Sequence, residues 1–219
     1  MLIDFQKKYG LKQDGDLGPA TAKKMREVFK MSTIETAHFL GQGSVESGFF
    51  SLKRESGNYS VSGLKETFSY YKNRPSEAQS DGRKPNEKAL STSRQKIIFD
   101  KVYDDKNRMP GYELGNTKIG DGWLFRGNAA GQTTGRREHQ ELANHLKDQR
   151  IMINPDIVWD EYYFEAFLYY LRSNNVFSKM KDVSRQSCNA VTLAINGKAM
   201  KHAILRYERT QHFYNLLNK

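Results

Sequence analysis

The sequence predicts a mainly α-helical protein with two lobes, in which long loops between the helices form a cleft. Three observations predict this class: apolar residues recur at helical spacing, hydroxyl or proline residues stand where helices would begin, and glycines stand where they would end. With 219 residues, 37% of them hydrophobic, the chain can bury roughly 70% of its unfolded surface. This length suits one domain with a small appendage.

The first 31 residues predict that appendage, a strip of two short helices around a turn. Apolar residues at positions 2, 5 and 9 mark the first helix, Asp14-Gly15 marks the turn, and Pro19 suits the first position of a helix to about Phe29. The strip resembles the second half of the peptidoglycan-binding repeat of wall hydrolases. The matching residues are Phe5-Gln6, Gly10-Leu11, Asp14-Gly15 and Gly18-Pro19-Ala20-Thr21. The match leaves open whether the strip binds the wall or has a purely structural role.

The next helix has the clearest limits, and it opens the second predicted domain, residues 32–219. Ser32 and Glu35 have the spacing of a capping box, which predicts a helix from Thr33 to about Glu46. Ser47-Gly48 should end this helix, because glycine tolerates the left-handed conformation that follows a last turn.

The remaining chain predicts further helices separated by loops. Helices are expected over residues 61–71, 89–103, 137–147, 160–172, 182–195 and 199–217. Residues 72–87 and 104–122 are expected to be loops, and residues 123–125 a short strand. The 160–172 stretch is apolar nearly all round, which favours a central buried helix over a sugar-stacking face.

Charge and cysteine content limit the function classes. The net charge of +10 favours polyanionic partners, namely nucleic acid, anionic membrane surface or an acidic wall polymer. No helix-turn-helix or base-stacking motif supports nucleic acid, and no apolar run approaches the ~20 residues of a membrane span. The single cysteine, Cys188, excludes an intrachain disulfide, and the N-terminus does not read as a signal peptide. We therefore expect no nucleic-acid partner, no stable membrane insertion, and a monomer.

Two carboxylates are candidates for acid–base chemistry. Glu46 lies at the predicted end of a helix, and Glu55 follows nine residues later. The glycines at 48 and 57 allow the chain to double back, so that the two side chains could face each other. Glycoside hydrolysis by inversion needs such a pair, roughly 6.5–9.5 Å apart, with a protonated acid and an ionised base. The spacing alone is common and does not establish catalysis.

Four motifs follow one another along the chain. They are Phe39-Leu40-Gly41-Gln42-Gly43-Ser44-Val45-Glu46-Ser47-Gly48-Phe49-Phe50, then Glu55-Ser56-Gly57-Asn58-Tyr59-Ser60 with Gly63-Leu64 and Thr67-Phe68, then Gly120-Asp121-Gly122-Trp123-Leu124-Phe125-Arg126-Gly127 continuing to Gly131-Gln132-Thr133-Thr134-Gly135-Arg136, and last Val191-Thr192-Leu193-Ala194-Ile195-Asn196-Gly197 followed by Arg206-Tyr207. Together they resemble the glycoside hydrolase family 19 group, which includes plant-type chitinases and many phage endolysins. The resemblance covers about residues 33–217 and implies a lysozyme-like two-lobed helical fold. At two positions this chain departs from the family pattern. It has Val45 where the family often has histidine, and Lys198 where the family prefers glycine.

The resemblance implies roles for individual residues. Glu46 would be the general acid and Glu55 the general base. Six further residues would bind the substrate or its water: Tyr59, Arg126, Gln132, Thr134, Asn196 and Arg206. Four of these residues could instead have a purely structural role. Gln132 and Thr134 could cap the helix that follows, Asn196-Gly197 is a common turn, and Arg206 could bridge to a surface acid.

These observations together favour an endolysin that hydrolyses the β-1,4 bonds of peptidoglycan, as a muramidase, by inversion and without metal or cofactor. The peptidoglycan glycan strand would be its partner. The resemblance implies that such a protein stays in the host cytoplasm until a separate membrane pore protein releases it to the cell wall. The alternatives are a chitinase acting on N-acetylglucosamine polymers and a non-catalytic wall-binding protein.

Overall fold

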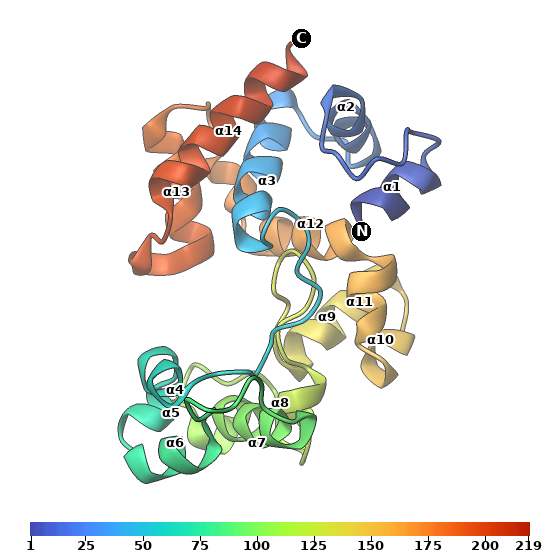
Figure 1. Ribbon diagram of the computed structural model, residues 1–219. Helices are drawn as coiled ribbons and strands as arrows, with labels where there is room; N and C mark the ends of the chain where they lie inside the picture. The colour runs from blue at the N-terminus through green and yellow to red at the C-terminus, as the bar shows by residue number, and fades with distance from the viewer. The chain divides into compact units, whose positions relative to one another are not determined.

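The computed structural model describes residues 1–219 and confirms the mainly α class (Figure 1). The helices are α1 (Leu2–Lys8), α2 (Pro19–Val28), α3 (Thr33–Glu46), α4 (Val61–Thr67), α5 (Ser69–Lys72), α6 (Pro75–Asp81), α7 (Thr92–Tyr103), α8 (Asp121–Leu124), α9 (Arg136–Leu146), α10 (Arg150–Ile153), α11 (Asp156–Glu161), α12 (Tyr163–Ser173), α13 (Arg185–Asn196) and α14 (Ala203–Leu217). Extended pairing is limited to isolated bridges, such as that between Arg54 and Asn128.

The chain folds into two compact units. Unit 1 comprises residues 1–53, 129–132 and 159–219, and unit 2 comprises residues 54–128 and 133–158. The N-terminal strip of residues 1–31 is part of unit 1. A domain boundary after residue 31 stays a prediction.

Unit 1 is built around α3, which packs along α14 (Figure 1). The predicted capping box is present: Ser32 Oγ accepts the Glu35 N–H, and the Glu35 carboxylate accepts the Ser32 N–H. Gly41 lets the two helices approach closely, because a Cβ there would lie 2.4 Å from Thr210 Oγ1 and 2.8 Å from the Thr210 backbone. This approach brings side chains of α14 to the C-terminal turns of α3.

Aromatic rings join the N-terminal strip to the rest of unit 1. Phe5 of α1 lies 6.1 Å from Phe29, measured between ring centroids, and Phe29 lies 5.8 Å from Phe39 of α3. Phe39 in turn lies 5.2 Å from Phe167 of α12. As the sequence predicted, α12 is largely buried, although it begins at Tyr163 and the shorter α11 precedes it.

Unit 2 departs from the predicted secondary structure at several places, one of which is α10, where no helix was predicted. The helix expected over residues 61–71 is broken at Phe68, whose backbone is extended and whose ring lies 5.0 Å from that of Tyr59. The loop expected over 72–87 contains α6, with Pro75 in its first turn. The strand expected over 123–125 is wrong: Trp123 belongs to α8, because Gly122 packs against the Phe99 backbone of α7.

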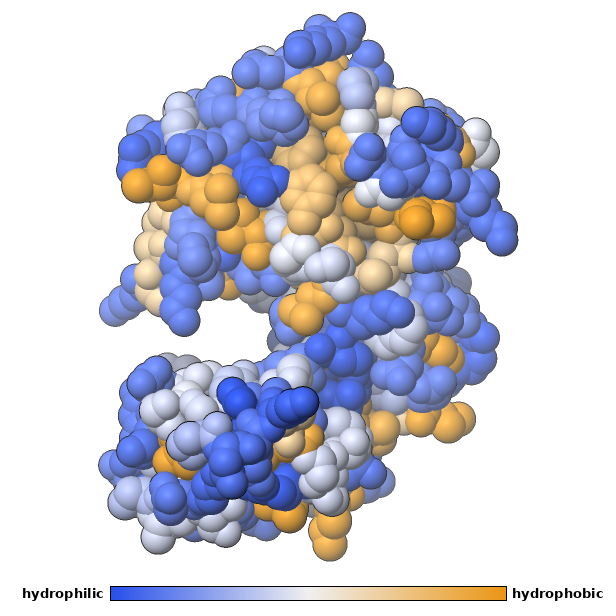
Figure 2. Space-filling view, in the orientation of Figure 1, coloured by the Kyte–Doolittle hydropathy of each residue, from blue (hydrophilic) through white to orange (hydrophobic).

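The face seen in Figure 2 is mainly hydrophilic, with apolar side chains among the polar ones. Leu193, Ile204 and Leu205 are among the exposed apolar residues of unit 1, and Ile97 and Ile119 among those of unit 2. Dispersed apolar residues of this kind are usual on protein surfaces. No helix combines the length and the apolar character needed to cross a bilayer.

Candidate active site

Glu46 is the last residue of α3 and forms an ion pair with Arg206 of α14. Arg206 Nη2 donates to Glu46 Oε1 at 2.7 Å. The Arg206 side chain is only 2% exposed, whereas that of Glu46 is 22% exposed. The acid to which Arg206 bridges is thus Glu46 itself, which is partly exposed. The buried guanidinium holds the carboxylate by a charge-assisted hydrogen bond.

The turn after Glu46 is conformationally strained. Gly48 has φ +56°, as the sequence predicted for a helix end, but Phe49 and Phe50 also have φ near +60° (62° and 61°). Bulky side chains rarely adopt this conformation, which costs of order 1–3 kcal/mol per residue. Packing compensates, because Phe50 is buried against Phe164 at a centroid distance of 5.3 Å. Strain of this kind is frequent at functional sites.

Glu55 lies in unit 2 and accepts three hydrogen bonds. Tyr103 Oη donates to Oε2 at 2.7 Å, Tyr59 Oη donates to Oε1 at 3.3 Å, and the Gly127 N–H donates to Oε2 at 3.4 Å. Burial raises the pKa of Glu55 above its ordinary value, although these donors and the Arg126 charge act in the opposite direction. Burial therefore disfavours the ionised form of Glu55 that a general base needs, whereas the hydrogen bonds favour that ionised form.

Both phenols are suited to remain donors. Burial, together with the neighbouring carboxylate of Glu55, raises the pKa of Tyr103 and that of Tyr59 well above the ordinary value of a tyrosine. Each hydroxyl therefore keeps its proton near neutral pH and can donate to Glu55. One phenol donates to each side-chain oxygen of Glu55.

The backbone of Glu55 is held against the turn that carries Arg126. The Glu55 N–H donates to the Gly127 carbonyl at 2.9 Å, and Arg126 Nε donates to the Glu55 carbonyl at 3.2 Å. The Arg126 guanidinium also lies 3.6 Å from the centroid of the Trp123 ring, a cation–π contact. Arg126 therefore positions Glu55 through its main chain, and Trp123 in turn positions Arg126.

Three predicted substrate ligands make local structural contacts. Gln132 has φ +49° and donates from Nε2 to a carbonyl of its own turn at 2.8 Å. The Thr134 N–H donates to Glu138 Oε2 at 2.9 Å, just before α9. Asn196 ends α13, and its Oδ1 accepts the Lys201 N–H at 2.6 Å. A substrate-binding role for these residues stays a prediction.

The structure thus brings the predicted residues together within each unit. In unit 1, Glu46 contacts Arg206; in unit 2, Glu55 contacts Tyr59 and Arg126. That Glu46 and Glu55 face each other stays a prediction.

Sequence reasoning missed two residues that contact this machinery. Tyr103 binds Glu55 from 48 residues away, and no local pattern indicates such a contact. Gln42 contacts Arg206 Nη1 and lies one helical turn before Glu46. The four-residue spacing on a predicted helix could have indicated that Gln42 and Glu46 share a face.

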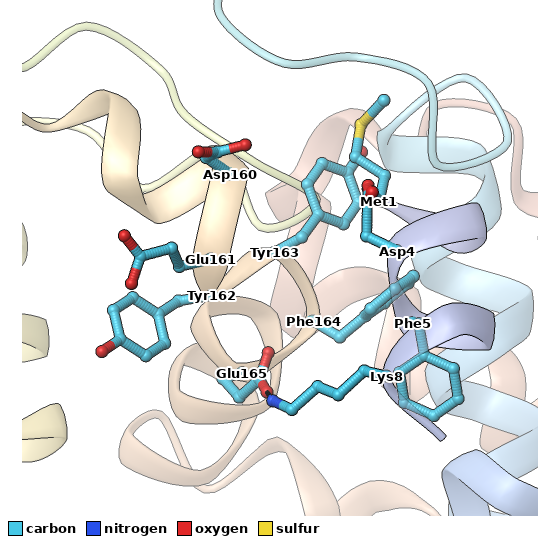
Figure 3. A pocket seen from close by; sticks show the side chains of 10 residues that line it. All are labelled: Met1, Asp4, Phe5, Lys8, Asp160, Glu161, Tyr162, Tyr163, Phe164 and Glu165. Atoms are coloured by element: carbon cyan, nitrogen blue, oxygen red, sulfur yellow. Dashed lines mark hydrogen bonds and ion pairs between the residues drawn. The ribbon is translucent and has the colours of Figure 1, made fainter. Parts of the chain in front are cut away.

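A separate pocket of about 410 Å³ lies in unit 1 between α1 and the start of α12 (Figure 3). Its lining includes Phe5, Lys8, Tyr162 and Glu165, and Lys8 Nζ lies 3.7 Å from Glu165 Oε1. None of the predicted site residues lines this pocket, so it is not the candidate active site. No group of three or more His, Cys, Asp or Glu side chains is arranged to hold a metal ion.

Comparison with known proteins gives one informative similarity. The chain is 35% identical over 116 residues to a Haemophilus influenzae protein described as a "Glycosyl hydrolase family 19 domain-containing protein". The matched region is 53% of this chain and 50% of that protein, so the chain spans about half the length of its curated relative. No family model matches the chain. The similarity supports a relationship to glycosyl hydrolase family 19.

Proposed function

We propose that this chain is a glycoside hydrolase that cleaves β-1,4 bonds of bacterial peptidoglycan by an inverting acid–base mechanism. The observation that carries the proposal is that Glu46 and Glu55 each have a dedicated set of donors. Arg206 holds Glu46, while Tyr103 and Tyr59 hold Glu55. The similarity to the family 19 domain-containing protein supports the same chemistry.

In the proposed reaction, Glu46 enters in its protonated form, with Arg206 donating to Oε1 and the proton on Oε2. It gives this proton to the glycosidic oxygen as the bond to the anomeric carbon breaks. Glu55 accepts a proton from the water whose oxygen attacks that carbon from the opposite face, which inverts its configuration. Proton exchange with solvent then restores both carboxyl groups. The phenols of Tyr103 and Tyr59 support this step, because they stabilise Glu55 as the carboxylate that must accept a proton.

Peptidoglycan is the proposed polymer for three reasons. The N-terminal strip resembles half of a wall-binding repeat, the single cysteine differs from the disulfide-rich plant-type chitinases, and the +10 charge favours an anionic wall. We propose that the protein acts as a muramidase-type endolysin after release by a separate pore protein. A chitinase is the second candidate, because family 19 also includes chitinases.

Side-by-side digestion of purified sacculi and chitin oligomers tests the proposal. We expect the wild type to release reducing ends from sacculi, with N-acetylmuramic acid at the reducing end by mass spectrometry. Glu46→Gln and Glu55→Gln should each lower the rate by at least about 100-fold. Release from chitin but not from sacculi would establish the chitinase instead, and wall binding without hydrolysis would establish a non-catalytic protein.

A further inference from the structure

The guanidinium of Arg206 is held by three acceptors, two on α3 and one in the segment just before α14. Besides Glu46, these are Gln42 Oε1, which accepts from Nη1 at 3.0 Å, and the Lys201 carbonyl, which accepts from Nε at 2.9 Å. Gln42 and Glu46 lie one turn apart on α3, so the same helix receives both terminal nitrogens of the guanidinium. A planar group held along two edges has a fixed orientation.

Thr192 of α13 helps to orient the Gln42 amide. Thr192 Oγ1 lies 2.8 Å from the Cys188 carbonyl and 3.4 Å from Gln42 Oε1, and the shorter contact takes its one hydrogen. Its oxygen then accepts from Gln42 Nε2, at 3.2 Å. This contact turns Nε2 toward Thr192 and Oε1 toward Arg206. The reverse amide orientation would place two donors, Gln42 Nε2 and Arg206 Nη1, against each other.

The Gln42 amide is fully buried, with 0% of the residue exposed, and so is Thr192. Neither residue can contact a polymer in solvent directly. Their hydrogen bonds nevertheless lead from α13 through Gln42 and Arg206 to the partly exposed carboxylate of Glu46. Gln42 and Thr192 can therefore affect Glu46 only through Arg206.

We propose that Gln42, oriented by Thr192, is a positioning residue for the hydrolysis. It fixes the plane of the Arg206 guanidinium and through it the place of the Glu46 carboxylate. The inference rests on the proposed function, in which Glu46 donates the proton. A displacement of about 1 Å at a catalytic group can cost on the order of 100-fold in rate, so a buried residue of this kind can control turnover without touching substrate.

Kinetics on soluble glycan fragments, corrected for the folded fraction, test the inference. Gln42→Met keeps the length of the side chain but removes the acceptor, and we expect kcat to fall about 10- to 100-fold with KM changed less than about threefold. Thr192→Val should lower kcat by a smaller factor, and Thr192→Ser, which keeps the hydroxyl, should restore it. Gln42→Met should cause little further loss in a Glu46→Gln background, because the group that it positions is already disabled.

The control is Tyr71→Phe, which removes a buried hydrogen bond to Asp81 in unit 2, 2.8 Å long. It should lower the melting temperature and leave kcat unchanged. Hydrolysis that depends on Glu46 but survives Gln42→Met at full kcat would overturn the positioning role alone. A wild type that hydrolyses neither polymer, or a Glu46→Gln variant as active as wild type, would overturn the proposed function and the positioning role with it.

Discussion

Tyr103 Oη donates a 2.7 Å hydrogen bond to Glu55 Oε2, joining the last residue of α7 to a residue 48 positions earlier in the chain. Tyr59 makes the corresponding contact with Oε1 at 3.3 Å. The two phenols therefore bind the same carboxylate at different strengths. Burial raises the pKa of Glu55, and both hydroxyls limit that rise.

Tyr103→Phe should make Glu55 harder to ionise. A hydrogen bond to a charged group contributes about 1.5–3 kcal/mol, and one pKa unit corresponds to about 1.4 kcal/mol. Removing it should raise the pKa of Glu55, so the acidic limb of the kcat/KM profile should move to higher pH by about one unit. Tyr59→Phe, which removes the longer bond, should give a smaller shift in the same direction. Equal shifts, or a shift to lower pH, would contradict this assignment.

The raised pKa of Glu55 also predicts a pH-dependent effect on stability. The folded state binds the Glu55 proton more tightly than the unfolded state does, so Glu55 favours folding most at low pH. This contribution disappears as pH rises through the folded-state pKa. Relative to wild type, Glu55→Gln should therefore become more stable as pH increases from about 4 to 7. Thermal unfolding of both proteins across this range measures the difference between their melting temperatures. This difference should change with pH, and a constant difference would contradict the prediction.

His139 should make unit 2 sensitive to acid. Burial lowers the pKa of His139 to about 3, and its Nε2 is buried without a partner. Because an unfolded histidine titrates near 6.5, stability should fall as pH decreases from about 6.5 toward 3, by up to about 1.4 kcal/mol per pH unit. Urea unfolding should show a flatter pH dependence for His139→Gln. A His139→Gln protein whose stability falls as steeply with acid as that of the wild type would contradict this assignment.

Gly41→Ala should destabilise unit 1. The added Cβ would lie 2.8 Å from the Thr210 backbone, which cannot move without displacing α14. Overpacking of this kind costs about 1–3 kcal/mol, and it should also weaken the Glu46–Arg206 contact. Gly18→Ala, where nothing lies within 4 Å of the new Cβ, should cost less than about 1 kcal/mol. Denaturant unfolding compares the two, and a Gly41→Ala protein as stable as Gly18→Ala would exclude a close helix contact.

Local signals allowed the sequence to predict much of unit 1. Ser32 and Glu35 cap α3 through contacts within one turn, so their spacing was sufficient to locate the helix. Pro19 likewise begins α2. The break at Phe68 could not be predicted in this way, because its cause is packing of the Phe68 ring between Tyr59 and Tyr103.

The sequence motifs singled out the two carboxylates and three residues that contact them, Tyr59, Arg126 and Arg206. The contacts themselves were not predictable, because most join distant segments. Arg206 lies 160 residues from Glu46 along the chain, and Tyr103 reaches Glu55 from the end of α7, 48 residues away. The burial that raises the pKa of Glu55 is likewise a property of the packed unit, which a single sequence does not contain.

The packing of α3 against α14 has a consequence for synthesis. During translation α3 leaves the ribosome long before α14 has been synthesised. The face of α3 that packs on α14 must therefore stay exposed, or make non-native contacts, until the C-terminal helix has emerged. Arg206 arrives with that same helix. A nascent chain therefore carries Glu46 without its cationic partner, and the Glu46–Arg206 ion pair can form only once α14 has been synthesised.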